Sequence, residues 1–269
     1  MEISNKVFFI TGAAQGLGRG MAEAALKRGG KVFIADLNTK IGEETLAALQ
    51  KEYGADNVRF GKCDVTKKDQ FTATFQSAVN SFGHIDVMVN NAGIMNDKTW
   101  ELMIAINVNA VIWETNLAME HMRKDKGGRG GVIINTASVV GLAPFFWFPV
   151  YTATKHAVVG FTKSWASNPN MPSMGVRLAC LCPSAADTNL IHPKPDQCIC
   201  YDSLMAYLDV LEIVPVSAVG DAFIKLVQDE DSNGKLIAIM PGSVSFYTEQ
   251  VLDPPLMMPK LDTSQDAKK

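Results

Sequence analysis

Short apolar runs alternate along the chain with longer segments of helical pattern, and this alternation restricts the possible fold more than any other feature. The apolar runs lie at 6–11, 31–36, 58–64, 85–91, 131–138, 175–182 and 235–240. Helical patterns lie between them, at 16–29, 39–53, 67–82, 99–125, 151–167 and 215–230. Runs that are apolar on both faces are typical of parallel strands covered by helices on both sides. The pattern predicts an α/β protein with a doubly wound, parallel, seven-stranded sheet of the Rossmann type.

The 269 residues, 47% of them apolar, are enough for one large core, so we expect a single cofactor-binding catalytic domain over 1–252. Residues 184–214 interrupt the alternation after the sixth run. Ligands in such sheets bind beyond the carboxyl ends of the strands, so this insertion is expected to cover the substrate. The Pro-rich segment 253–269 is expected to be a C-terminal tail.

Charge and composition argue against several classes of partner. The net charge is −3 and the basic residues are scattered, so nucleic acid is not expected. No apolar run approaches the ~20 residues of a membrane helix, and the N-terminal residues do not resemble a signal peptide. We therefore expect a cytoplasmic protein without a membrane span. The Cys-x-Cys pairs at 180–182 and 198–200 lack zinc-site spacing, so no metal is expected.

A glycine-rich stretch, TGAAQGLG at 11–18, follows the first apolar run and opens a helical pattern. Glycines at 12, 16 and 18 let the backbone approach a pyrophosphate, which the free N–H groups of a helix start favour. Asp36 ends the second run, where a carboxylate can bind both ribose hydroxyls of adenosine and repel a 2′-phosphate. Positions 13–15 and 37 hold no Lys or Arg, so NAD is predicted rather than NADP. The alternatives are a ligand-free turn and a solvated Asp36.

Further motifs follow in a fixed order: CDV at 63–65, NNAG at 90–93, Asn107, Ser138, Tyr151 and Lys155. With TGAAQGLG and Asp36, they resemble the short-chain dehydrogenase/reductase family over about residues 5–240. The resemblance implies an NAD-dependent alcohol dehydrogenase of lipid metabolism, an oxidoreductase that is usually a homodimer or homotetramer. It implies that Asn107 kinks its helix and holds a proton-relaying water. The family's Pro-Gly after the sixth strand is Pro183-Ser184 here, and its usual Asn is Ala179, which leaves the cofactor affinity open.

The resemblance assigns residues to two groups. The catalytic residues are Asn107, Ser138, Tyr151 and Lys155. The cofactor-binding residues are Gly12, Gln15, Gly16, Leu17, Gly18, Asp36, Leu37, Cys63, Asp64, Val65, Asn91, Ala92, Gly93, Tyr151, Lys155, Pro183 and Thr188.

Oxidation of an alcohol requires a base for the hydroxyl proton while hydride leaves carbon. Tyr151 is the candidate base, although a free phenol has a pKa near ~10. Lys155 lies one helical turn later, so its charge is expected to favour the phenolate. Ser138 can hydrogen-bond the substrate oxygen. Taken singly, the three residues would more often be a cap, a buried aromatic residue and a solvated charge.

Four aromatic residues, FFWF at 145–148, lie between Ser138 and Tyr151 and are expected to border the reacting hydroxyl. The predicted substrate residues are Ser138, Phe145, Trp147, Phe148, Tyr151, Leu190, Ile191 and Tyr207, with Met95 and Leu211 beside them. A subunit interface or ordinary core packing is the alternative.

The substrate class follows from the same aromatic run. Family members that oxidise the 15-hydroxyl of prostaglandins have Gln where this chain has Trp147 and Phe148. A more apolar secondary alcohol is therefore favoured: a retinoid, isoprenoid, steroid or fatty alcohol. The alternatives are prostaglandin 15-hydroxyl oxidation, an NADPH-dependent reductase, and a non-catalytic NAD- or lipid-binding protein.

Overall fold

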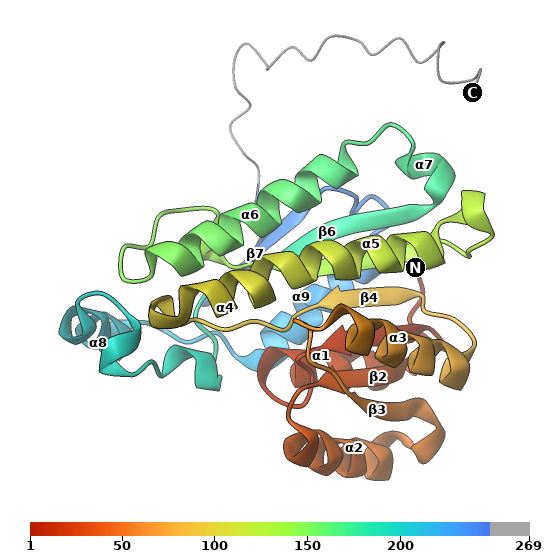
Figure 1. Cartoon of the computed structure of the whole chain (residues 1–269), viewed down its shortest axis with the longest axis horizontal. Coiled ribbons are helices and arrows are strands. Elements are labelled where there is room, and N and C mark those ends of the chain that lie inside the picture. Colours follow the sequence, from red (N-terminus) through yellow and green to blue (C-terminus); the bar gives the residue numbers. More distant parts are fainter. Residues whose placement is uncertain (248–269) are drawn as a thin grey trace.

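Among residues 1–247, which the computed structural model describes, eight strands form one sheet in the order β3-β2-β1-β4-β5-β6-β7-β8 (Figure 1). Neighbouring strands are parallel except for the antiparallel pair β7–β8. The strands are β1 (Val7–Thr11), β2 (Lys31–Asp36), β3 (Val58–Lys62), β4 (Val87–Asn90), β5 (Gly131–Thr136), β6 (Val176–Pro183), β7 (Leu236–Met240) and β8 (Ser243–Tyr247). The predicted tail at 253–269 lies outside the described residues.

The prediction of seven strands is wrong by one, because β8 follows β7 in a tight reversal. Gly242 lies at the reversal with φ +70°, a left-handed conformation that glycine adopts readily. All five residues of β8 are exposed, so the run SVSFY lacks the buried face that marks the other strands. The Pro-Gly pair before it was the available signal for a hairpin.

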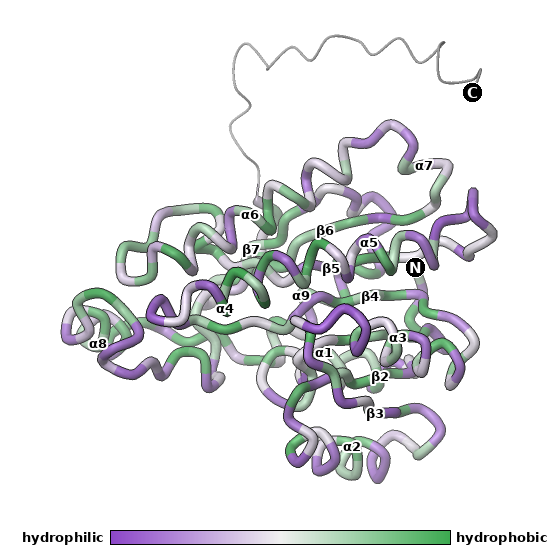
Figure 2. The backbone as a smooth tube through the Cα atoms, viewed as in Figure 1, coloured by the Kyte–Doolittle hydropathy of each residue, from purple (hydrophilic) through white to green (hydrophobic). Residues whose placement is uncertain are grey.

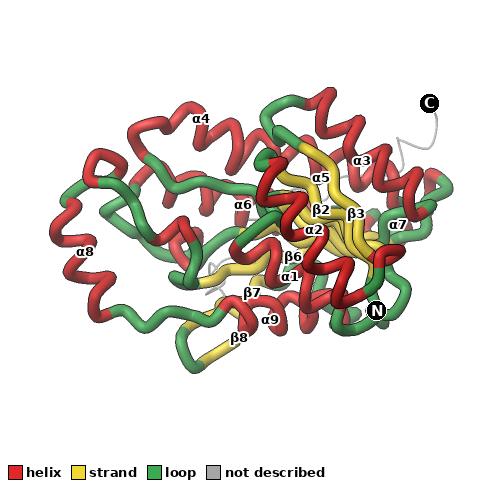
Figure 3. The backbone as a smooth tube through the Cα atoms, turned by 90° about the horizontal axis from the view of Figure 1, so that it is seen from below, coloured by secondary structure: helices red, strands yellow, loops and turns green. Residues whose placement is uncertain are grey.

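Helices cover both faces of the sheet (Figures 1 and 3), which confirms the doubly wound α/β prediction. One core cluster joins the strands to α1, α2 and α9, and the cores on the opposite face join them to α3, α5 and α6. Figure 2 shows apolar strands in the interior and hydrophilic stretches along the outer helices. The helices are α1 (Gly16–Leu26), α2 (Thr39–Tyr53), α3 (Lys68–Phe82), α4 (Trp100–Ile104), α5 (Val111–Met122), α6 (Pro149–Ala166), α7 (Met171–Met174), α8 (Tyr201–Val210) and α9 (Val216–Gln228).

The single helix expected at 99–125 is divided into three parts. A π-helical segment, Ala105–Ala110, joins α4 to α5. The stretch Asp97–Met122 is long and apolar enough to cross a membrane by length and composition, a criterion that core helices of soluble proteins also meet. Its most apolar window is 44% buried inside the fold, and α5 packs in the core beside the sheet. Packing on the sheet therefore accounts for part of its apolar character.

The strand order changes direction between β1 and β4, and hydrogen bonds join the starts of the loops that follow these two strands. Thr11, the last residue of β1, accepts hydrogen bonds at Oγ1 from the N–H groups of Asn91 (3.0 Å) and Ala92 (3.1 Å). Ligands of doubly wound sheets bind at this switch point. The insertion 184–214 contains α8, which lies at the far left of Figure 1, beyond the same end of the strands.

Candidate active site

A cavity of about 1250 Å³ lies along the carboxyl ends of the strands, from the glycine-rich loop to α8. It brings together residues from the predicted catalytic, cofactor-binding and substrate-binding sets. The predicted residues that line it are Gly12, Gln15, Gly16, Leu17, Asp36, Leu37, Cys63, Asp64, Val65, Asn91, Ala92, Gly93, Ser138, Phe145, Phe148, Tyr151, Lys155, Pro183, Thr188, Leu190, Ile191 and Tyr207.

Three predicted residues lie outside the cavity wall. Gly18 packs inside the loop instead, where an added Cβ would lie 2.3 Å from the carbonyl oxygen of Gly12. Asn107 is buried behind the loop that follows β4. Trp147 faces the covering insertion: its ring stacks on Tyr207 with 4.9 Å between centroids, and its Nε1 donates to Ser203 Oγ at 3.3 Å.

The glycine-rich loop presents backbone donors to the cavity. Gly12 and Gly16 adopt positive φ, +63° and +58°, which other residues adopt at a cost. Helix α1 begins at Gly16 without a capping side chain, and its first turn has no acidic residue. The free N–H groups and the positive end of the helix dipole therefore face the cavity, an arrangement that binds anions.

Asp36 has two roles at the end of β2. Its Oδ2 accepts from the N–H of Ala14 at 3.0 Å, and its Oδ1 accepts from the N–H of Asn38 at 2.9 Å. The carboxylate thus fixes the glycine-rich loop, and it also lines the cavity beside Leu37. Each carboxylate oxygen has a second lone pair for a ligand hydroxyl.

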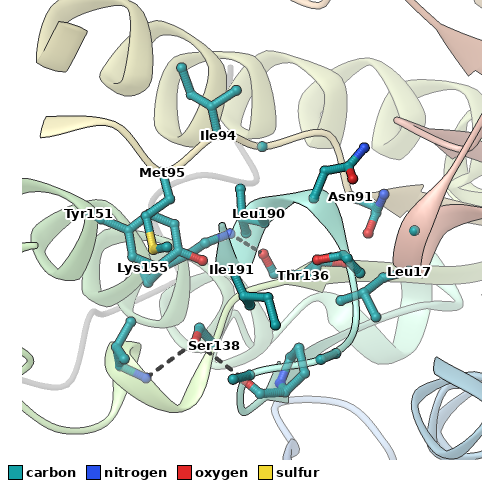
Figure 4. A pocket seen from close by; sticks show the side chains of 18 of the residues that line it. Leu17, Asn91, Ile94, Met95, Thr136, Ser138, Tyr151, Lys155, Leu190 and Ile191 are labelled. Atoms are coloured by element: carbon teal, nitrogen blue, oxygen red, sulfur yellow. Dashed lines mark hydrogen bonds between the residues drawn. The ribbon is translucent and has the colours of Figure 1, made fainter. Parts of the chain in front are cut away.

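Ser138, Tyr151 and Lys155 converge on one side of the cavity (Figure 4). Ser138 Oγ donates to the carbonyl of Pro183 at 3.1 Å and accepts from the N–H of Val140 at 3.3 Å. Lys155 Nζ donates to the carbonyl of Thr136 at 2.8 Å and lies 5.5 Å from the ring centroid of Tyr151. The ammonium group is thus held close to the phenol by a backbone atom.

Burial dominates the protonation of these groups. It raises the pKa of Tyr151 above the ordinary value, and a hydrogen bond with Ser138 opposes this shift. It lowers the pKa of Lys155 to about 8, with Cys182 and Cys180 acting in the other direction. The expectation that Lys155 lowers the pKa of Tyr151 is not met: burial raises this pKa, and the opposing contribution comes from the hydrogen bond with Ser138.

Asn107 lies in the π-helical segment and is 1% exposed. Its Oδ1 accepts from the N–H of Ile94 at 3.0 Å, and its Nδ2 donates to the carbonyl of Ile94 at 2.9 Å. The same Nδ2 lies 3.2 Å from Thr154 Oγ1 on α6. Asn107 thus joins the loop that lines the cavity to the helix that carries Tyr151, and the predicted kink in its helix coincides with the π-helical segment.

The aromatic run divides between interior and surface. Phe148 is fully buried, and Phe145 stacks against it with 6.2 Å between centroids. Phe146 is 60% exposed and points away from the core. Phe145 and Phe148 therefore form part of the cavity wall, while Trp147 holds α8 in place over it.

Several cavity residues were missed from the sequence. Leu204 and Leu208 of α8 line the wall with Tyr207 and Leu211, and their spacing of three and four residues was the available helical signal. Thr136 contributes through its carbonyl, which no sequence pattern reveals.

Comparison with known proteins supports the resemblance to the short-chain dehydrogenase/reductase family. The family model for short chain dehydrogenase matches residues 6–198. The stretches HIDVMVNNAGIMNDKTWE and PVYTATKHAVVGFT predict particular similarity to NAD-dependent 15-hydroxyprostaglandin dehydrogenase, and this is confirmed. The mouse enzyme of that name is 36% identical over 263 residues, 96% of this chain and 98% of its own. A 3beta-hydroxysteroid dehydrogenase 2 from Eggerthella lenta is 38% identical over 200 residues, 70% of this chain and 74% of its own.

Among solved structures, a short-chain dehydrogenase/reductase from Burkholderia phymatum in complex with NAD has a similar fold, with a TM-score of 0.79. The two chains are 24% identical, and the match covers 90% of this chain and 91% of the other. The motifs, the arrangement of the sheet and the family match agree: this chain belongs to the short-chain dehydrogenase family.

Proposed function

We propose that the protein oxidises a secondary hydroxyl of an apolar, lipid-like alcohol, transfers the hydride to NAD and uses Tyr151 as general base. The observation that carries this proposal is the convergence of Ser138, Tyr151 and Lys155 on a cavity that also contains the glycine-rich loop and Asp36. An alcohol and a dinucleotide could therefore meet in one cavity.

The residues of the cavity fit NAD. The uncapped start of α1 supplies N–H donors for a pyrophosphate. Asp36 and Leu37 border the region where an adenosine ribose would bind, and neither offers a positive charge to a 2′-phosphate. The names of the mouse relative and of the Burkholderia structure both include NAD, which supports the same choice.

The chain's own groups can move the proton. NAD, when bound, supplies the hydride acceptor and one positive charge. Ser138 Oγ can hydrogen-bond the substrate oxygen, and Tyr151 takes the hydroxyl proton. Because burial raises the pKa of Tyr151, the phenolate needs nearby positive charge. Lys155, with a pKa of about 8, carries that charge at neutral pH and lies 5.5 Å from the phenol ring.

The substrate side of the cavity is apolar. Phe145 and Phe148 from the aromatic run line it together with Leu204, Tyr207 and Leu211 of the covering insertion, and the ring centroid of Phe145 lies 6.4 Å from that of Tyr207. Such a wall favours hydrocarbon over a polar chain because it offers few hydrogen-bonding groups. Retinoid, isoprenoid, steroid and fatty alcohols fit this description.

A prostaglandin 15-hydroxyl is the second candidate substrate. It is favoured by one observation, the 36% identity to the mouse prostaglandin enzyme over nearly the whole of both chains. Two observations weigh against a polar lipid at this position. Phe148 places an aromatic ring in the cavity wall, and the indole N–H of Trp147 already donates its hydrogen bond to Ser203.

The test is the absorbance of NADH when the purified protein receives NAD or NADP and a panel of alcohols. The panel contains retinoid, isoprenoid, steroid, fatty, prostaglandin and short secondary alcohols. We expect turnover with NAD on one of the apolar classes. Turnover on prostaglandin alone would select the second candidate. NAD binding without turnover of any panel member would instead favour a non-catalytic binding protein.

A further inference from the structure

A short 3-10 turn, Asp97–Thr99, lies between the cavity and the start of α6. The loop that leads to this turn lines the cavity from Asn91 to Met95, and Asn107 holds it at Ile94. At the turn itself, Asp97 reaches across to α6. Its Oδ2 accepts from the N–H of Val150 at 2.9 Å, and its Oδ1 accepts from the N–H of Tyr151 at 3.2 Å.

These two hydrogen bonds complete the first turn of α6. The helix begins with Pro149, which has no N–H, and Phe148 before it provides no side-chain cap. The N–H of Thr152 already donates to the carbonyl of Phe148 at 2.9 Å. The donors that remain are those of Val150 and Tyr151, and both are satisfied by one carboxylate. Asp97 therefore acts as the cap of a helix to which it does not belong.

We propose that Asp97 is a positioning residue, whose carboxylate fixes the first turn of α6 and thereby holds the Tyr151 phenol against Ser138. This rests on the proposed role of Tyr151 as base. The side chain of Tyr151 leaves the same turn that Asp97 binds, and it is 6% exposed in a packed wall with Met103, Phe148 and Leu204. Loss of the cap would allow the first turn to rotate, and an error of about 1 Å at a reacting group can lower a rate ~100-fold.

The ion pair of Lys98, the residue that follows Asp97, provides a control. Lys98 forms an ion pair with Asp196 in the covering insertion, and the two side chains are 61% and 56% exposed. Exposed pairs of this kind contribute little free energy. Asp196→Asn therefore removes the charged partner of Lys98, which lies in the same turn as Asp97, without changing the cap of α6.

The first measurement compares kcat, KM and the dissociation constant of NAD for the wild type, Asp97→Ala, Asp97→Asn and Asp196→Asn. The turnover number is expressed per NAD-binding site, so that unfolded molecules do not count. We expect Asp97→Ala to lower kcat by about 10- to 100-fold, with NAD affinity unchanged. Asp97→Asn should lie between Asp97→Ala and the wild type because one oxygen acceptor remains, and Asp196→Asn should match the wild type.

The second measurement is hydrogen exchange of the Val150 and Tyr151 amides, which requires no substrate. Both amides should exchange faster in Asp97→Ala than in the wild type or Asp196→Asn, while the later turns of α6 stay protected. Wild-type exchange at these amides overturns the proposal, and so does faster exchange with an unchanged kcat. A wild type that oxidises no alcohol refutes the proposed function instead, and exchange alone then decides whether Asp97 fixes the turn.

Discussion

At the scale of single residues, the site depends on groups held in place by backbone atoms. Lys155 is held by the carbonyl of Thr136, Ser138 by the carbonyl of Pro183, and Asp36 by two N–H groups. The identities of Ser138, Tyr151 and Lys155 could be predicted from the motif. Their backbone partners could not, because every residue carries the same carbonyl and only the fold selects one.

Replacement of Tyr151 by Phe tests the base directly. The phenol oxygen is removed while the ring stays in its buried wall, so Tyr151→Phe should bind NAD as the wild type does. Turnover should fall by about 100-fold or more, the usual contribution of a general base. Steady-state rates give the turnover number, and a fluorescence titration with NAD gives the dissociation constant. Wild-type turnover in this variant would exclude Tyr151 as the base.

Asp36 is the corresponding test for the cofactor. Asp36→Ala should weaken NAD binding by roughly 10- to 100-fold, the equivalent of a charged hydrogen bond, and should bring the NAD and NADP affinities closer together. NAD binding could also weaken because the glycine-rich loop shifts, since the Asp36 carboxylate accepts a hydrogen bond from the N–H of Ala14 in that loop. Asp36→Asn separates the two effects, since its carbonyl oxygen can still bind Ala14 while its charge is gone. Unchanged affinities for both cofactors in both variants would refute the assignment.

At the scale of elements, α5 carries a carboxyl group that the sequence did not reveal as unusual. Glu114 is 1% exposed, its Oε1 has no hydrogen-bond partner among the described residues, and burial raises its pKa to about 8. The helical pattern placed this residue in a helix, but the direction it faces depends on the π-helical segment just before α5. That segment adds a residue to the turn and shifts the face that follows it.

The stability of the protein should therefore depend on Glu114 and pH. The folded state keeps the proton between the ordinary pKa of 4.5 and about 8, while the unfolded state releases it. Stability from this group is thus complete below pH 4.5 and is lost as pH rises through about 8. The free energy of unfolding of Glu114→Gln should be close to the wild-type value at pH 5 and should exceed it by roughly 3–5 kcal/mol at pH 9. Urea unfolding at the two pH values measures this, with exposed Glu101→Gln as the control. Equal stabilities at pH 9 would contradict the burial argument.

At the scale of the whole molecule, the doubly wound sheet and the position of its cavity could be predicted because periodicity and strand order are local or topological properties. The conformation of the insertion could not be predicted, since α8 is held by contacts such as Trp147 with Tyr207 that join distant segments. The eighth strand was missed for a related reason: an exposed edge strand carries no buried pattern.

The cavity at the switch point also links ligand binding to global stability. A ligand that binds only the folded chain adds about 2.7 kcal/mol at a hundredfold excess over its dissociation constant. NAD at that excess should raise the melting temperature of this protein, and NADP at the same concentration should raise it far less, because of Asp36. Thermal unfolding followed by fluorescence provides the comparison, and the Asp36→Ala variant should reduce the difference between the two nucleotides. An equal shift for both nucleotides in the wild type would contradict the predicted preference.

The hairpin of β7 and β8 bears on where the chain can be shortened. β7 is an apolar strand, LIAIM, and β8 occupies the edge that it would otherwise present to solvent. An open apolar edge is a template for pairing with other chains. A version that ends at Met240 would keep every residue proposed for the reaction and yet expose this edge, so self-association would become its main difficulty during expression and storage.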